Sequence, residues 1–167
     1  QQFIAMVNKR AKIVLLIETV EAVECIDSIL EIDGIDEVYI GLNDLHLGLG
    51  CKHMFEPLSK GIIDTLSKKI LSKDIPFGLG GIAKFGEGQI DPRLILSEHR
   101  RLNSSRVILS RAFHQNAKTL TELKKRINLK KELDLIKEHF NDLKFTPEKE
   151  LIQNKNLLKN NIRKITA

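Results

Sequence analysis

Residues 12–45 read KIVLLIETVEAVECIDSILEIDGIDEVYIGLNDL, and this stretch decides the fold. Two short apolar runs flank an amphipathic segment that closes near an Asp-Gly turn. The runs are 13–17 and 38–41, and the helix between them is expected over residues 19–31. An apolar run, an amphipathic helix and a second apolar run are typical of a βαβ unit with parallel strands.

The same pattern recurs further along the chain. Apolar runs at 76–79 and 107–109 predict two more strands. Helices are expected from Pro57 to Ile70 and from the Asp91-Pro92 pair to Asn103, because proline suits a first helical position. Four βα units are half of an eight-stranded barrel, which usually takes about 250 residues. We therefore expect an α/β fold in which residues 1–115 form the C-terminal half of a (β/α)8 TIM barrel.

Residues 116–167 are expected to form a basic helical extension, with helices at 118–143 and 147–163. The formal net charge of the chain is +5, and the excess of Lys and Arg lies in this region. These cations alternate with leucine and isoleucine at helical spacing, which favours a solvated helix face. Nucleic-acid binding is disfavoured because no recognised motif or aromatic stacking platform accompanies the charge.

Composition excludes several other classes. No apolar run reaches the roughly 18 to 20 residues that span a bilayer, and no targeting segment opens the chain, so we expect a cytoplasmic protein without a membrane partner. Cys25 and Cys51 lack the CxxC spacing of a zinc or redox site, and two reduced thiols are expected.

The chain opens with Gln1 inside what resembles the end of a helix. We therefore expect a fragment that lacks an N-terminal half, a truncated gene product, or a half-barrel that pairs with another copy. Four parallel strands leave unpaired edges and an uncovered inner face, so a homo-oligomer or a pairing with another half-barrel is predicted.

Two carboxylates follow the first two strands. In barrels of this kind the reactive groups project from the carboxyl ends of strands, where Glu18 and Asp44 are found. Neighbouring strands lie about 4.8 Å apart, so both side chains could reach one ion, and oxygen ligands suit Mg²⁺ or Mn²⁺. Glu18 is equally consistent with an ordinary acidic residue at a helix N-terminus.

These residues also carry a family resemblance. Ile17-Glu18-Thr19 with Ala22 is similar to an I-E-T-x-x-A turn, and residues 34–45 are similar to a G-x-D-x-x-x-I-G-P-x-D-L strand. A glycine pair, Gly80-Gly81, follows downstream. Over residues 12–115 the chain resembles the citrate lyase beta-subunit and 4-hydroxy-2-oxo-acid aldolase family, within the phosphoenolpyruvate/pyruvate-binding TIM-barrel superfamily.

The resemblance implies a metal-dependent carbon–carbon lyase or aldolase domain for a small 2-oxo acid or a related acyl compound. It implies a divalent metal held by Glu18 and Asp44, and a substrate carboxylate received by backbone N–H groups near Asn43 and Asp44. The substrate-binding residues it implies are Gly41, Leu42, Asn43, Asp44, Gly80 and Gly81. The family's base and substrate-orienting cation lie mostly on the N-terminal half, which precedes the residues present here.

The chain departs from the family pattern at Leu16, Leu42 and His46, where the family often has Gln, Pro and Ser. His46 is a weak candidate for a general acid or base, with a solvated or packing role as the alternative. Arg111, at the end of the last strand, is a weak candidate for an anion contact. Two other hypotheses stay open, a non-catalytic relic half-barrel that acts as an assembly unit and a basic-tailed binding module.

Overall fold

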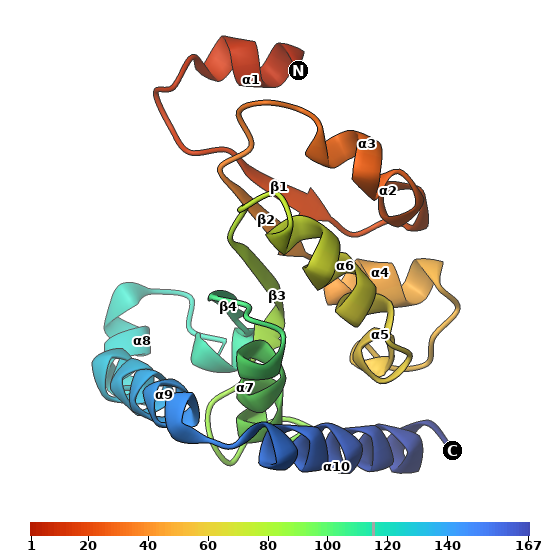
Figure 1. The fold of residues 1–167 in the computed structure, drawn as a ribbon. Coiled ribbons are helices and arrows are strands. Elements are labelled where there is room, and N and C mark those ends of the chain that lie inside the picture. Colours follow the sequence, from red (N-terminus) through yellow and green to blue (C-terminus); the bar gives the residue numbers. More distant parts are fainter. Residues whose placement is uncertain (115) are drawn as a thin grey trace.

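The computed structural model describes residues 1–114 and 116–167, and within them the chain folds around a parallel sheet of four strands (Figure 1). The strands are β1 (Val14–Ile17), β2 (Glu37–Ile40), β3 (Phe77–Ile82) and β4 (Arg106–Leu109). They lie in sequence order, β1-β2-β3-β4, with Ile17 beside Ile40 and Ile40 beside Leu79. The predicted parallel pairing and α/β class are confirmed.

Helices connect and follow these strands. Their bounds are α1 Gln2–Val7, α2 Val20–Glu24, α3 Ile26–Leu30, α4 Leu42–Gly48, α5 Glu56–Ser59, α6 Ile62–Leu71, α7 Pro92–Arg101, α8 Leu120–Arg126, α9 Leu129–Asp142 and α10 Glu148–Thr166. Short 3₁₀ turns span Arg111–Phe113 and Leu143–Phe145. Asp91 begins α7 as expected, because its side chain accepts a hydrogen bond from the Arg93 N–H.

Three predicted helices are each divided in two. The helix expected over 19–31 breaks at Cys25, whose ψ of 9° leaves the helical range. The helix expected from Pro57 breaks at Gly61, which has a φ of +77°. The helix expected over 118–143 breaks before Asn128, because the Asn128 side chain accepts from the Lys131 N–H and begins α9. Residues 42–48, which include Asp44 and His46, form α4, a helix that the sequence pattern does not predict.

A main core fills the space between one face of the sheet and helices α3 to α7. Its fully buried members include Ile40, Leu45, Ile63 and Phe77. Leu158 and Ile162 of α10 belong to the same core, so the basic extension packs back onto the strand-bearing region. A second, smaller core joins β4 and α7 to α8, α9 and the start of α10.

Charged side chains also connect α10 to the layer of helices. Asp64 on α6 binds Arg101 of α7 at 2.7 Å and Lys155 of α10 at 2.9 Å, while Arg101 also binds the buried Glu98 at 2.7 Å. Burial opposes ionisation of Asp64, but the hydrogen bonds from Arg101 and Lys155 hold the pKa of its carboxyl below the usual value. Among the described residues, no helix is both long and apolar enough to cross a membrane.

Candidate functional site

Glu18 lies directly over the backbone at the end of β2. The Gly41 N–H donates to the Ile17 carbonyl at 2.8 Å, which fixes the ends of β1 and β2 side by side. A Cβ added at Gly41 would lie 2.9 Å from both Cβ and Oε2 of Glu18. Glycine at this position therefore leaves the space that the Glu18 carboxylate occupies.

Asp44 reaches the same edge of the sheet from α4. It lies in the first turn of that helix, which begins immediately after Gly41, and its side chain is exposed. Within the described residues, the side chains of Glu18 and Asp44 have no hydrogen-bond or ion-pair partner. Two carboxylates without protein partners at adjoining strand ends fit an oxygen-ligated cation such as Mg²⁺ or Mn²⁺, whose other positions would be filled by water or substrate.

Few side chains are available as metal ligands at this edge. No group of three or more His, Cys, Asp or Glu side chains suited to a metal occurs in the part of the chain that the structure describes. Mg²⁺ commonly binds proteins through one or two carboxylates with several retained waters. Two protein ligands are therefore compatible with that ion.

The implied substrate-binding residues divide into two groups. Gly41, Asn43 and Asp44 lie at the carboxyl edge beside Glu18. Leu42 does not present its side chain there, because it is fully buried and fills the space above Gly80, where an added Cβ would lie 2.9 Å from Leu42 Cδ1. Only the backbone of Leu42 is available to a ligand.

The glycine pair of β3 is also divided between two environments. The Gly80 carbonyl is occupied by the hydroxyl of Tyr39, which also lies 3.1 Å from the Leu79 carbonyl. Gly81 faces the other way and lines a cavity of about 200 Å³ with Phe55, Gln89, Ile90 and Ser110. His53 closes the margin of this cavity through a 3.0 Å hydrogen bond to Gln89.

The two catalytic candidates, His46 and Arg111, lie on different elements. His46 is half-buried on α4, and its Nδ1 lies 3.2 Å from the Leu42 carbonyl of its own helix. Arg111 is exposed and begins the 3₁₀ turn after β4. Since β4 is separated from β1 by β2 and β3, the fold of one chain does not bring Arg111 next to Glu18.

Sequence reasoning missed the role of Tyr39. Its hydroxyl accepts from the Ile108 N–H at 2.8 Å while facing the carbonyl groups of β3, so it connects β2, β3 and β4. Burial raises the pKa of Tyr39 to about 12, which keeps the hydroxyl protonated. Tyr39 is the single Tyr in the sequence, and it lies between the apolar strand residues Val38 and Ile40. A polar hydroxyl in such a strand needs a hydrogen-bond partner, and this requirement could have indicated its structural role.

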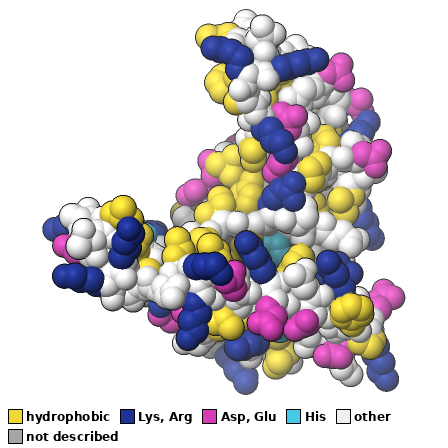
Figure 2. Space-filling view, turned by 90° about the vertical axis from the view of Figure 1, so that its left-hand side faces the viewer, with side chains coloured by type: hydrophobic (Ala, Val, Ile, Leu, Met, Phe, Trp, Pro, Cys, Tyr) yellow, Lys and Arg dark blue, Asp and Glu magenta, His cyan; other side chains and the backbone are white. Residues whose placement is uncertain are grey.

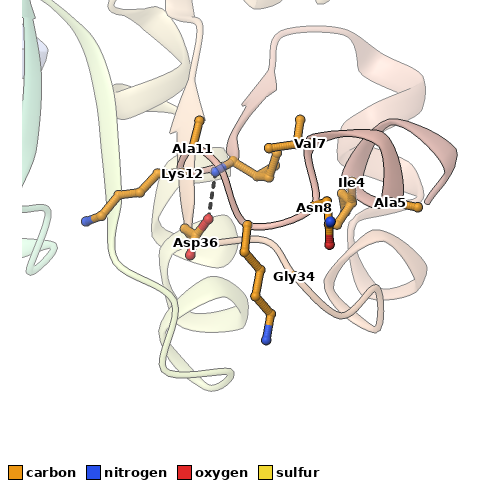
Figure 3. Close-up of a pocket in the computed structure, with 10 residues that line it drawn as sticks. Ile4, Ala5, Val7, Asn8, Ala11, Lys12, Gly34 and Asp36 are labelled. Atoms are coloured by element: carbon orange, nitrogen blue, oxygen red, sulfur yellow. Dashed lines mark hydrogen bonds between the residues drawn. The ribbon is translucent and has the colours of Figure 1, made fainter.

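A larger cavity of about 650 Å³ lies at the opposite edge of the sheet, beneath α1 (Figure 3). Its lining includes Ile4, Asn8 and Lys12, and Asp36 there accepts from the Ile13 N–H at 2.6 Å. This edge carries the amino ends of β1 and β2, whereas ligands of parallel α/β sheets bind outside the carboxyl ends of the strands. The carboxyl edge with Glu18 and Asp44 is therefore the candidate functional site.

Comparisons with protein-family models, with curated proteins and with solved structures find no match to this chain.

Proposed function

We propose that this chain is a metal-dependent carbon–carbon lyase or aldolase domain for a small 2-oxo acid or a related acyl compound, built from four βα units of a (β/α)8 barrel. The observation that supports it most directly is the pair of unpartnered carboxylates, Glu18 and Asp44, at adjoining parallel strand ends. The resemblance of residues 12–115 to the citrate lyase beta-subunit and aldolase family points the same way.

Glu18 and Asp44 are the residues that would hold the divalent ion. Such an ion supplies Lewis-acid stabilisation of the negative charge that develops on an oxo oxygen when a carbon–carbon bond is made or broken. Gly41 contributes by leaving room for the Glu18 carboxylate, which a larger residue would displace. The backbone N–H groups near Asn43 and Asp44 open α4, where they lack partners within the helix and can receive a substrate carboxylate.

A second function, that of a non-catalytic half-barrel acting as an assembly unit, is favoured by the surroundings of this pair. No described side chain makes a hydrogen bond or ion pair with either carboxylate, so neither is oriented by a neighbouring base or cation. His46, the nearest candidate along the chain, contacts the carbonyl group of Leu42. A non-catalytic assembly unit would keep the four-stranded fold but would not catalyse carbon–carbon bond cleavage or formation.

Metal titration separates these two functions. We expect Mg²⁺ or Mn²⁺ to bind the wild-type chain in calorimetry, and we expect Glu18→Gln and Asp44→Asn each to weaken binding by more than about tenfold, since each removes a charged ligand. Asp33→Asn is the matched control, because Asp33 is an exposed acidic residue in the turn before β2. Equal affinity in all four proteins would contradict the proposed metal site and favour the assembly unit.

A further inference from the structure

In the part of the chain that the structure describes, one face of the sheet lacks a covering layer. Helices α2 to α7 pack against the other face, while the side chains of Val14, Leu16 and Ile108 remain 54%, 47% and 56% exposed. Figure 2 shows hydrophobic side chains gathered at the centre of this open side, below α1. Val14 and Leu16 lie on β1 and Ile108 on β4, so exposed apolar side chains flank this face on both outer strands, and apolar surface gathered on one face marks an interaction site.

The outer strands add unpaired backbone to this face. β1 pairs only with β2 and β4 pairs only with β3, so each has one edge without partners in the described sheet. The β1 edge reads Val-Leu-Leu-Ile and contains no charge, proline or bulge, the features that normally protect an edge strand. A covering partner therefore has to supply strands as well as apolar side chains.

We propose that the partner is a second copy of this chain, which closes the sheet into an eight-stranded parallel barrel. A two-fold axis along the strand direction preserves that direction, and it sets β4 of each copy parallel to β1 of the other. The sequential strand order and the helices on the outer face are those that such a barrel requires. The exposed Val14, Leu16 and Ile108 then become part of its interior.

Charge at the carboxyl edge is complementary in this arrangement. Glu18 follows β1 and Arg111 follows β4, and neither has a partner among the residues described. Adjacent strands lie about 4.8 Å apart, so the closed barrel brings Arg111 of one copy to the same edge as Glu18 of the other. If the proposed function holds, the second copy also supplies a guanidinium for the carboxylate of a 2-oxo acid, whereas the dimer itself does not depend on that function.

A carboxylate offsets part of the positive charge at the amino edge. Lys12 and Arg106 both lie near the edges that would meet, but both bind Glu37 of their own chain, at 3.3 and 2.9 Å. The hydrogen bond from Arg106 holds the pKa of the Glu37 carboxyl below its usual value. Within each copy, the Glu37 carboxylate therefore offsets part of the positive charge that Lys12 and Arg106 bring to these edges.

Analytical ultracentrifugation of residues 1–167 over a range of concentrations tests the proposal. We expect a dimer, and we expect Leu16→Glu to raise its dissociation constant at least about 100-fold while far-ultraviolet circular dichroism stays that of the wild type, because this side chain is already half exposed in one copy. Ile152→Glu is the matched control, since Ile152 is equally exposed, at 47%, on α10. It should leave the dimer intact.

A charge exchange tests the pairing of the two edges. Arg111→Glu and Glu18→Arg should each weaken the dimer, and the double variant should regain affinity. A monomer at every concentration, or a dimer indifferent to Leu16→Glu, would overturn the proposal, and the monomer would instead point to further βα units on the same polypeptide as the occupant of this face. Metal titration is read separately, so a dimer that binds no Mg²⁺ contradicts only the proposed function.

Discussion

At the scale of single residues, the packing of the Tyr39 ring over β3 depends on the absence of a side chain at Gly78. A Cβ there would lie 2.6 Å from Arg106 Cβ and 2.7 Å from Tyr39 Cε2. Glycine therefore lets the Tyr39 ring cross β3 and lets its hydroxyl reach the Ile108 N–H.

We predict that Gly78→Ala lowers the free energy of unfolding by about 3 kcal/mol, the upper end of the usual cost of over-packing. Gly81→Ala is the control in the same strand, because its added Cβ would find its nearest neighbour at an ordinary 3.7 Å. It should change stability by less than about 0.5 kcal/mol. Urea unfolding of both variants measures the difference, and equal losses would show that Gly78 is not a point of close approach.

His99 gives a pH-dependent contribution to stability. Its ring is buried beside Ser104, with Nδ1 2.8 Å from the Ser104 hydroxyl, and burial lowers its pKa to about 4 from an ordinary 6.5. Below pH 6.5 the unfolded chain binds a proton that the folded chain refuses, so stability should fall as the pH drops from 6.5 to 4. The difference corresponds to roughly 3 kcal/mol over that range.

We predict that His99→Gln removes this part of the pH dependence when unfolding free energies are measured between pH 7 and 4. His114→Gln should retain it, because His114 is exposed. Parallel pH profiles for all three proteins would mean that His99 is hydrated and titrates normally in the folded chain.

At the scale of helices and strands, α10 anchors the extension through one buried stripe. Leu158 lies in the main core, whereas the neighbouring Leu157 is 50% exposed. We predict that Leu158→Ala costs about 2–5 kcal/mol of unfolding free energy, while Leu157→Ala costs less than about 0.5 kcal/mol. Thermal or urea unfolding monitored by circular dichroism measures both, and similar small losses would show that α10 is not part of the cooperative core.

The strands were predictable from sequence because each is a short apolar run between turn signals. The breaks in the helices were only partly predictable. Gly61 and Asn128 are residues that commonly interrupt or begin helices, so both left a signal. Cys25 left none, because its neighbours continue the apolar stripe and the change is one of backbone angle alone.

The candidate site was predictable to the same limited extent. Glu18 and Asp44 were identified because strand ends can be read from the apolar runs that precede them. The burial of Leu42 and the hydrogen bond of His46 could not be predicted, since both depend on residues 42–48 forming a helix against β3. Periodicity over seven residues is too short to separate such a helix from a loop.

At the scale of the whole molecule, the arrangement of charged and polar groups separates binding from turnover. Carbon–carbon cleavage of a 4-hydroxy-2-oxo acid needs a group that removes the proton of the 4-hydroxyl. The histidines that follow β2 and β4 already have hydrogen-bond partners: His46 contacts the Leu42 carbonyl, His53 contacts Gln89, and His114 accepts from the Asn116 N–H. Under the proposed function Glu18 and Asp44 would hold the metal, so each of these side chains already has another partner.

We therefore predict that residues 1–167 bind Mg²⁺ and pyruvate-like acids without appreciable aldolase turnover. Loss of a general base typically lowers the rate by about 10² to 10⁴, and poor positioning lowers it further. Exchange of the pyruvate methyl protons with solvent, followed by NMR, is the sensitive measurement, because polarisation of a bound oxo acid acidifies its methyl group enough for water or hydroxide to remove a proton slowly. Slow exchange that Glu18→Gln abolishes is the expected result. Cleavage of a 4-hydroxy-2-oxo acid above about 1 s⁻¹ would contradict the prediction and direct attention to His46 and Arg111 as the groups that complete the site.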